Sequence, residues 1–593
     1  MTTNQLSSDT DVIFITIDSL RPDMLRGSSP SPTPFLDSLF NDGFELTSCY
    51  STGYPTQFAL PGLMTSTLPL DYGGYEYGIR TRPTALSESF QNAGYSTAAF
   101  VTAFWLGRLY GYDRGIKTFC PLFNLEFWTK NLKGVYLKYA KQLIESGDKS
   151  TEEAVELLCP LVGEFLDHLV DYCNERRAEV NQERLHPHYL SSRLHAWDFE
   201  RAADVAKKAQ ESFDKDPTTF VATLLQETKQ EESSRLFQRE GSWFDELLAT
   251  QLSERAESKS KWLRSLPLVA SWASPYGPSP SRMFEQPMED IENWVDMVRR
   301  GKISSARYVT ENLATWIEGS EDPYFAWTHL HDIHSESMFT LDFDEEQWFG
   351  TELAGHRKFL RGWGGKSLPE STNISRTLSS RYVDTVLEQF VNRVVEGSNN
   401  PPLIVITADH GKQRPTRSGD HVNQFYDSLL HVPVAFVHPD LESGSFDGLC
   451  SSLDIAPTLL NLLGIDIPES FDGVPVSQYP DGGRSYVIAE DLGRGPCDPS
   501  KPANICLRTD DRKVVCSAPV NGNERFSVEY ASDLKEDPQE LSPLDTSDLP
   551  EGFDTLIENV RKRAHQIRQS LAGDAGIPPN SGPSSGNLWK NTQ

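Results

Sequence analysis

The chain has 593 residues, of which 38% are hydrophobic and 10% aromatic, so it can bury a core and is not disordered throughout. It carries 85 acidic residues against 55 Lys and Arg residues, a formal net charge of −30. A surface this acidic repels nucleic acid and anionic lipid, so we expect neither as a partner. An anionic substrate would need a local positive centre, such as a metal ion.

The N-terminal segment 1–11 is polar and contains no Lys or Arg. It lacks the basic and apolar regions of a signal peptide, and no run reaches the roughly 18 apolar residues of a membrane helix. The eight cysteines form no C-x-x-C pair, which indicates buried free thiols rather than disulfides or a cysteine metal site. We expect a cytoplasmic protein without membrane insertion.

Residues 11–119 alternate short apolar strands with amphipathic helices. The run "DVIFITID" predicts a buried strand that ends at Asp18, and "TPFLDSLFNDGF" predicts a helix that stops at Gly43. "TALSESFQNAGYSTAAFV" predicts a helix, a stop at Gly94 and another strand. This alternation predicts an α/β fold with a mainly parallel sheet and crossover helices.

From about residue 121 to 300 the pattern changes to helical periodicity with many charges, which predicts a helical insertion. It could serve as a lid that selects the substrate or as an oligomer interface. The strand–helix alternation then resumes with the strands "YFAWTHLHDIH" and "PPLIVITADHG". Short alternating strands after residue 484 predict a small antiparallel sheet.

The predicted organisation therefore has five parts. They are a first part of the α/β domain at 1–120, the helical insertion at 121–300, a second part of the α/β domain at 301–483, a C-terminal subdomain at 484–573, and a Pro/Gly/Ser-rich disordered tail at 574–593.

Two of the predicted strands end in acidic residues, "FITID" at Asp18 and "VITADHG" at Asp409 and His410. Ligands of an open parallel sheet gather beyond the carboxyl ends of its strands, so these three side chains should lie close together. A single Asp after a strand is commonly a turn or cap residue, but the same ending on two strands favours a shared role. Two carboxylates and an imidazole can bind a divalent cation.

Five segments, in the same order, resemble the sulfatase-like branch of the alkaline phosphatase superfamily. They are "VIFITIDSLRPDML", "ITADHG", "YDSLLHVPVAF", "LDIAPTLLNLLGI" and "YASDLKEDPQELSPL". The resemblance spans most of the chain except about 121–300 and the tail. It implies an enzyme whose metal-bound nucleophile attacks phosphorus or sulfur and forms a covalent intermediate.

The same resemblance singles out a nucleophile within "CYSTGYPTQFALPGLMTS", residues 49–66. The family places a Thr nine residues after its nucleophile, and counting back from Thr65 gives Thr56 as nucleophile and metal ligand. Ser51 and Thr52 fall outside this register, and we expect them to be turn and capping hydroxyls. Thr56 could itself be only a helix cap, or could lie in a loop before a helix that begins nearer Phe58.

The sequence departs from the family pattern in ways that bear on the substrate. Sulfatases of this type oxidise a Cys or Ser within C/S-x-P-S-R to formylglycine; that motif is absent here, and a Thr cannot form the aldehyde. The resemblance thus favours relatives with a plain Thr, which resemble phosphodiesterases, phosphonate hydrolases and phospho-alcohol transferases. Ser19 replaces a second Asp, and two basic substrate contacts are missing, a Lys-x-His after "STAAF" and a Lys shortly before Tyr426.

Several other polar residues are candidates for contacts to the substrate. By resemblance, His334 in "THLHDIHSES" and His421 in "SGDHV" contact the substrate or protonate the leaving group. Lys412, directly after D-H-G, could supply positive charge, as could Arg414 or Arg417.

The number of metal ions depends on further ligands. Asp332, His334 and His421 could hold a second ion, but their spacing does not match the D-x-x-x-H of two-zinc relatives. We therefore expect one divalent ion (Ca, Mn, Mg or Zn), bound by Asp18, Thr56, Asp409 and His410. His329 and His331 should share one strand face, where one of them could be a packed residue or lie behind the ligands.

Taken together, the sequence predicts a metal-dependent hydrolase or transferase with a Thr nucleophile. Its substrate would be a small or glycan-linked anionic ester, a phosphodiester, a phosphonate or a sulfate. A true sulfatase with an unmodified Thr is a further possibility. The missing basic residues and Ser19 leave an alternative of another class, a degenerate relative that binds an anionic ligand without turnover.

Overall fold

The computed structural model describes most of the chain outside several internal segments and the two ends. The described residues are 5–26, 31–75, 78–121, 149–181, 198–233, 243–248, 306–320, 323–334, 368–396, 400–412, 425–479, 482–493, 501–520 and 526–573, with a few single residues between 132 and 147. The predicted tail at 574–593 lies outside these residues, as does a large part of the predicted insertion.

A nine-stranded, mostly parallel sheet forms the centre of the molecule. Its strands are β1 (Val12–Ile17), β2 (Phe44–Tyr50), β3 (Ser96–Val101), β4 (Thr118–Pro121), β5 (Tyr324–Leu330), β6 (Leu403–Thr407), β7 (His431–Val437), β8 (Gly444–Phe446) and β9 (Cys450–Ser451). The order is β4-β3-β5-β1-β6-β7-β2-β8, with β9 paired to β2. β1 lies between β5 and β6, parallel to both, and every residue of these three strands is buried.

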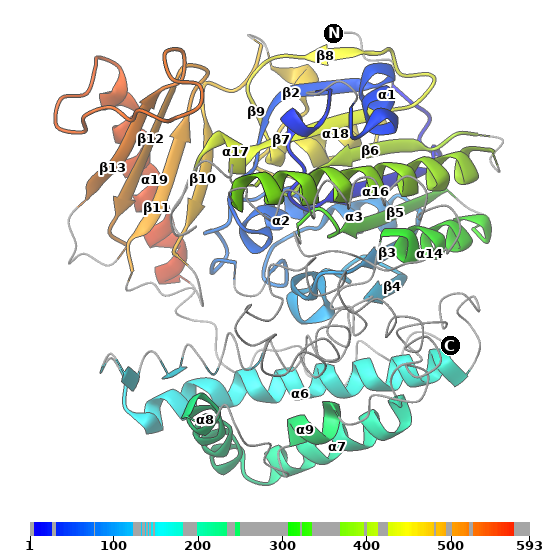
Figure 1. Ribbon diagram of the computed structural model, residues 1–593, viewed down its shortest axis with the longest axis vertical. Coiled ribbons are helices and arrows are strands. Elements are labelled where there is room, and N and C mark those ends of the chain that lie inside the picture. The colour runs from blue at the N-terminus through cyan, green and yellow to red at the C-terminus, as the bar shows by residue number, and fades with distance from the viewer. Residues whose placement is uncertain are drawn as a thin grey trace.

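Helices cover this sheet, as the predicted α/β fold requires. α16 (Leu368–Glu396) contacts both α1 (Pro34–Asp42) and α14 (Ala306–Glu318), and Figure 1 shows α16 running across the sheet. A second group consists of α2 (Thr56–Thr65), α3 (Leu86–Asn92) and α18 (Ile455–Leu462), which meet around α2. The apolar strands "VIFITI" and "LIVIT" are fully enclosed because parallel strands bury both faces.

A separate group of helices lies below the sheet in Figure 1. It contains α6 (Thr151–Asn181), α7 (Phe199–Lys215), α8 (Pro217–Ser233) and α9 (Trp243–Leu248). α6 contacts the short helix η3 (Arg108–Tyr110), and Arg80 forms an ion pair with Glu164 of α6. The described residues of the predicted insertion are thus helical, while its boundaries and its role as lid or interface stay predictions.

The predicted small antiparallel sheet is also present. It has four strands, β10 (Val487–Asp491), β11 (Ala503–Arg508), β12 (Arg512–Ala518) and β13 (Ser527–Asp533). Successive side chains of a strand point to opposite faces of this sheet. Ile505 and Leu507 pack in the cluster that includes α19 (Phe553–Gly573), whereas Cys506 packs towards Tyr50 of the main sheet. Figure 1 shows this sheet beside the main one, and α19 is a helix that we did not predict from the sequence.

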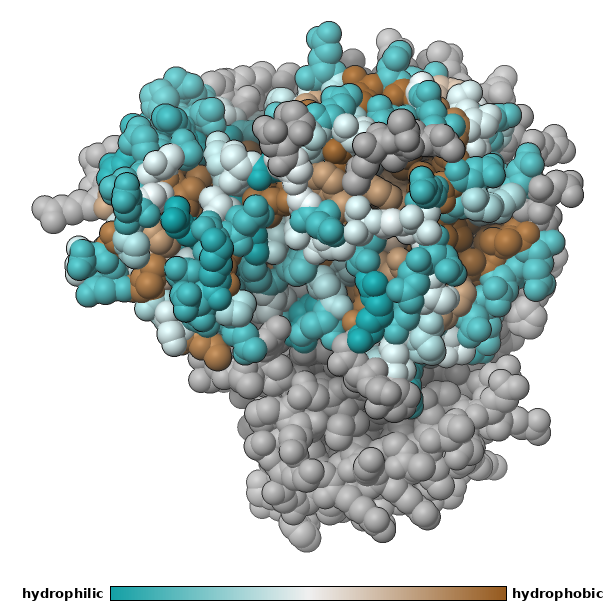
Figure 2. Space-filling view, turned by 90° about the horizontal axis from the view of Figure 1, so that it is seen from above, coloured by the Kyte–Doolittle hydropathy of each residue, from teal (hydrophilic) through white to brown (hydrophobic). Residues whose placement is uncertain are grey.

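The seven described cysteines are free thiols, as expected from their spacing. Among the described residues, no helix combines the length and apolarity needed to cross a membrane. Figure 2 shows one face of the molecule, where hydrophilic residues cover much of the described surface and hydrophobic residues are scattered between them.

A buried ammonium group joins the small sheet to the main domain. Lys513 of β12 is fully buried, and its Nζ donates to the Phe425 carbonyl oxygen at 2.9 Å and to Glu540 Oε1 at 2.8 Å. It also pairs with Asp427, which begins α17 (Asp427–Leu430) and lies against Arg508 at 3.1 Å. Two acidic residues from different segments therefore converge on one Lys.

We expect Lys513→Met to destabilise the fold by about 3–5 kcal/mol, because it leaves buried carboxylates without their cation. The free energy of unfolding from a denaturant titration measures this loss. Lys535→Met is the matched control, since Lys535 is 73% exposed and its contact to Asp511 is 3.4 Å long. That control should change stability by less than about 1 kcal/mol. Equal effects of the two substitutions would contradict the structural role of Lys513.

Candidate metal centre

The main sheet brings four chain segments to one edge. β1 pairs with β5 and β6 so that Thr16 lies beside His329 and Thr407, and the residues that follow each strand therefore emerge together. β2 runs in the same direction as β6, because both are antiparallel to β7. The end of β2 leads through residues 51–55 to Thr56, so this residue reaches the same edge.

Asp18, Asp409 and His410 meet at this edge as predicted. All three are fully buried, and one ligand atom of each lies within 4.8 Å of the others. His410 Nε2 is 3.7 Å from Asp18 Oδ1 and 3.4 Å from Asp409 Oδ2. His410 Nδ1 lies 2.7 Å from the Gly411 carbonyl oxygen, which can only accept, so Nδ1 carries a proton and Nε2 is the nitrogen that faces the carboxylates.

Thr56 is the first residue of α2 and points into the same group. Its Oγ1 lies 3.5 Å from Asp18 Oδ2 and 3.3 Å from His410 Nε2. The helix begins at Thr56 and the hydroxyl makes no capping hydrogen bond, so the loop and cap alternatives are both wrong. The other two hydroxyls donate to backbone carbonyls, Ser51 to Gly53 at 3.0 Å and Thr52 to Phe58 at 3.2 Å, as expected of turn residues.

The surroundings shift the pKa values of Asp18 and Asp409 in opposite directions. Burial alone would raise the pKa of Asp18, but the neighbouring imidazoles of His334 and His331 hold that pKa well below its ordinary value. Burial, followed by the charge of Asp18, raises the pKa of Asp409. A divalent cation between them would favour the charged form of both groups.

The residues fit such a cation. Asp409 Oδ2 is buried and makes no hydrogen bond to the described part of the chain, although His410 Nε2 lies close to it. Two carboxylates, one imidazole lone pair and the Thr56 hydroxyl form a mixed O and N ligand set, which divalent metals accept. Asp18, Thr56, Asp409 and His410 would therefore hold one divalent ion.

Ser19 has a supporting role at the position where relatives have a second Asp. Its φ is 66°, the left-handed region that non-glycine residues rarely adopt. This conformation lets Ser19 Oγ donate to Asp18 Oδ1 at 2.9 Å and its backbone N–H donate to Asp409 Oδ1 at 3.4 Å. Ser19 thus fixes the orientation of both predicted metal ligands.

The loop after β5 adds one residue that we did not predict as part of the site. His331 Nδ1 lies 2.6 Å from Asp18 Oδ2, and the His331 ring stacks on that of His334 with centroids 4.3 Å apart. The parallel register would have revealed His331, because it follows β5 by the step at which Asp18 follows β1. Asp332, weighed above for a second metal, instead accepts at 3.2 Å from the backbone N–H of Ala306 at the start of α14.

His334 is close to the centre, and its pKa is lowered there. The charge of Asp18 would raise its pKa, but burial and the neighbouring His331, His410 and Lys412 outweigh that effect and lower the pKa to about 3. Its ring lies 6.5 Å from that of His410, centroid to centroid. The predicted contact of His334 with the substrate or the leaving group stays a prediction.

Lys412 and Arg21 connect the loops around the centre. Lys412 Nζ donates to the His334 carbonyl oxygen at 2.5 Å, and the Lys412 carbonyl accepts from Arg21 Nη1 at 3.0 Å. Arg21 also pairs with Asp23 at 2.7 Å. His421, Arg414 and Arg417 lie outside the described residues.

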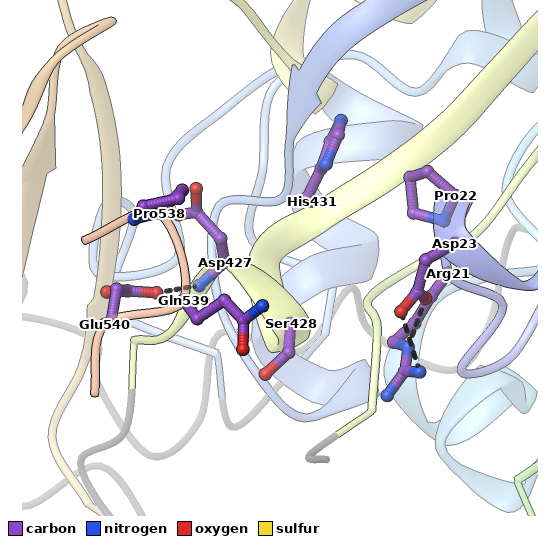
Figure 3. Close-up of a pocket in the computed structure, with 9 residues that line it drawn as sticks. All are labelled: Arg21, Pro22, Asp23, Asp427, Ser428, His431, Pro538, Gln539 and Glu540. Atoms are coloured by element: carbon purple, nitrogen blue, oxygen red, sulfur yellow. Dashed lines mark hydrogen bonds and ion pairs between the residues drawn. The ribbon is translucent and has the colours of Figure 1, made fainter. Parts of the chain in front are cut away.

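A polar hollow of about 150 Å³ lies next to this region (Figure 3). Its lining residues are Arg21, Pro22, Asp23, Asp427, Ser428, His431, Pro538, Gln539 and Glu540. Around it, Arg21 forms an ion pair with Asp23, and Glu540 accepts a hydrogen bond from the backbone N–H of Asp427. None of the predicted metal ligands lines it, so we do not assign the substrate to this hollow.

Comparisons with known proteins agree with the fold. A family model described as Sulfatase matches residues 10–224 and 264–465, more than half of the chain, and the chain therefore belongs to the sulfatase family. This membership confirms the predicted resemblance to that family. Whether it belongs to a branch with a Thr nucleophile is a matter for the proposal below.

The individual relatives have low sequence identity to this chain. Arylsulfatase K of Mus musculus is 24% identical over 169 residues, which are 27% of this chain and 29% of that protein, so the chain matches less than a third of that relative's length. The structure of yidJ from Bacteroides fragilis has a TM-score of 0.50 at 12% identity and covers 96% of this chain and 99% of its own. The phosphonate monoester hydrolase of Agrobacterium radiobacter has a TM-score of 0.49 at 14% identity, covering 95% and 96%. The yidJ structure shares the fold of this chain.

Proposed function

We propose that the protein transfers a phosphate-type group, from a phosphodiester or phosphonate ester, through a Thr56 nucleophile and a covalent intermediate. The observation that carries this proposal is the position of the Thr56 hydroxyl, which lies between Asp18 and His410 at the start of a helix. A helix N-terminus favours a negatively charged group in front of it.

The chain's own residues suit each part of this reaction. Thr56 Oγ1 forms a bond to phosphorus as the bond to the leaving alcohol breaks, and the hydroxyl proton leaves for a neighbouring base. A divalent ion held by Asp18, Thr56, Asp409 and His410 would lower the pKa of the hydroxyl and neutralise charge on the ester oxygens. His334 would contact the ester, and by prediction His421 would supply a proton to the leaving alcohol. Water or an alcohol would then release the group from Thr56.

Phosphorus rather than sulfur is favoured by the nucleophile itself. Residues 56–60 read "TQFAL" and lack the C/S-x-P-S-R pattern whose first residue becomes formylglycine. A Thr keeps its hydroxyl and its methyl group, so the covalent intermediate must be an ordinary ester of Thr56. Its hydrolysis or transfer requires attack at phosphorus, with charge developing on oxygens beside the cation.

The alternative of a non-catalytic binder rests on the missing basic residues. Of the proposed substrate contacts within the described residues, Lys412 is already bonded to the His334 carbonyl oxygen. An anion would then bind mainly through the metal ion.

The proposed enzyme would act on a small or glycan-linked substrate and would be located in the cytoplasm.

A panel of esters tests the proposed function. We expect phosphodiesters or phosphonate monoesters to be cleaved faster than matching aryl sulfates when Mn²⁺, Mg²⁺, Ca²⁺ or Zn²⁺ is supplied. The measurement is the initial rate of release of a common phenol leaving group. Faster cleavage of the sulfate would overturn the preference for phosphorus, and stoichiometric metal without turnover of any ester would support the binder.

A further inference from the structure

The chain on both sides of α2, the helix that begins at Thr56, is attached to the small C-terminal sheet. Before the helix, the Thr52 carbonyl oxygen accepts from the backbone N–H of Glu490 in β10 at 3.0 Å. Gly53 lies so close to the same strand that a Cβ there would be 3.2 Å from the Glu490 carbonyl oxygen. The loop that leads to Thr56 therefore lies against β10.

The Glu490 side chain binds the segment that follows the helix. It is fully buried, and its Oε1 accepts from the backbone N–H of Leu70 at 2.9 Å. Arg563 of α19 donates to both carboxylate oxygens, from Nη2 to Oε1 at 2.7 Å and from Nε to Oε2 at 2.8 Å. Arg563 Nη2 also pairs with Asp71 Oδ1 at 2.9 Å. One buried ion pair is thus attached to the chain before α2 and to the chain after it.

The first turn of α2 also packs against the C-terminal subdomain. Phe58 belongs to the apolar cluster of the small sheet and α19, and its ring lies 3.9 Å from that of Tyr75, centroid to centroid. Apolar packing is non-directional, whereas a bidentate ion pair adds geometric specificity. The orientation of α2 therefore depends on Glu490 and Arg563.

The position of the Thr56 hydroxyl depends on that orientation. Thr56 Oγ1 belongs to α2, whereas its two neighbours, Asp18 Oδ2 at 3.5 Å and His410 Nε2 at 3.3 Å, follow strands of the main sheet. A small rotation of the helix would move the hydroxyl relative to both. A misplacement of about 1 Å can lower the rate of a reaction by about 10²-fold.

We propose that Glu490, held in place by Arg563, is a positioning residue for the Thr56 nucleophile; this role rests on the proposed function. The ion pair acts through the backbone on both sides of α2, and its loss leaves the predicted ligands Asp18, Asp409 and His410 unchanged. Loss of the pair should therefore lower kcat and have little effect on KM or on metal content.

Turnover by Glu490→Gln tests the proposal. We expect kcat for the best phosphorus ester to fall by about 10- to 100-fold, with KM and metal content nearly unchanged. The amide oxygen can still accept from Leu70, but the amide nitrogen cannot accept from Arg563. The variant should fold, because the Arg563 cation keeps its contact with Asp71.

Glu318→Gln is the matched control for this substitution. Glu318 also accepts two bonds from one guanidinium, that of Arg393, at 2.6 and 2.7 Å, but this pair joins α14 to α16. The control should keep the kcat of the unchanged protein. Equal kcat values for Glu490→Gln and Glu318→Gln would overturn the positioning role.

Hydrogen exchange separates a positioning role from general destabilisation and requires no activity. In Glu490→Gln, the peptide of residues 51–66 should exchange at least about tenfold faster than in the control, whereas the peptides of β1 and β6 should be unchanged. Equal acceleration in all three peptides, or none in 51–66, would also overturn the positioning role.

Different results would contradict the two proposals. Full turnover by Thr56→Ala would exclude the proposed function, and the exchange of residues 51–66 in Glu490→Gln would not depend on it. An unchanged kcat in Glu490→Gln, together with an inactive Thr56→Ala, would overturn the positioning role alone.

Discussion

Thr56→Ala should lower turnover of the best phosphorus ester by at least about 10³-fold while leaving the fold intact, since removal of an enzyme's nucleophile typically has effects of this size or larger. The reason is that no other described hydroxyl lies between Asp18 and His410. The measurement is kcat at saturating substrate, with metal content and thermal unfolding determined on the same samples. Metal should remain bound, because Asp18, Asp409 and His410 are unchanged.

Two matched variants separate a nucleophile from a structural hydroxyl. Thr56→Ser keeps the reacting oxygen and should retain much more activity than Thr56→Ala. Ser51→Ala removes a hydroxyl of the same loop that donates only to the Gly53 carbonyl, and turnover should survive. If Thr56→Ala kept the rate of the unchanged protein, Thr56 would not be the nucleophile.

Strand ends and helix patterns were enough to predict the α/β fold and the meeting of Asp18, Asp409 and His410. Those predictions depend on one physical rule, that parallel strands present their carboxyl ends at the same edge. The buried runs "VIFITI" and "LIVIT" are apolar along their whole length, so their assignment to central strands was secure.

Contacts that depend on register or on distant segments could not be predicted in the same way. His331 reaches Asp18 only because β5 is the neighbour of β1, and the sequence alone does not give the strand order. The same is true of Lys513, whose two acidic partners come from segments more than 100 residues apart, Asp427 and Glu540. Side-chain pairing of this kind follows from tertiary structure.

The segments that carry the family resemblance divide into two physical roles. Asp18 and the D-H-G segment hold the candidate metal centre. Asp427 of "YDSLLHVPVAF" and Glu540 of "YASDLKEDPQELSPL" instead bind the buried Lys513, and Asp454 of "LDIAPTLLNLLGI" accepts from Arg484 at 2.7 Å. These acidic residues bind basic side chains of neighbouring segments, so we expect a variant there to act mainly through stability.

Asp409→Asn should remove metal-dependent stabilisation together with turnover. The amide keeps an oxygen that can accept from the backbone N–H groups of His410 and Ser19, which lie 2.8 and 3.4 Å from Asp409 Oδ1, so the local structure can persist. It loses the negative charge that balances a cation. With metal at 100 times its dissociation constant, the unchanged protein should gain about 2.7 kcal/mol in unfolding free energy, and the variant much less.

Comparing the stability of the unchanged protein and Asp409→Asn without metal gives a stricter test of the same prediction. In a chelator, the unchanged protein must bury two neighbouring carboxylates, Asp18 and Asp409, whereas Asp409→Asn buries one, so the variant should be at least as stable. Asp384→Asn is the control, because that buried carboxylate accepts from the backbone N–H groups of Phe35 and Leu36 at the start of α1, and it should leave the metal response unchanged. Thermal unfolding with and without metal gives both quantities, and an equal metal response in Asp409→Asn and Asp384→Asn would exclude Asp409 as a ligand.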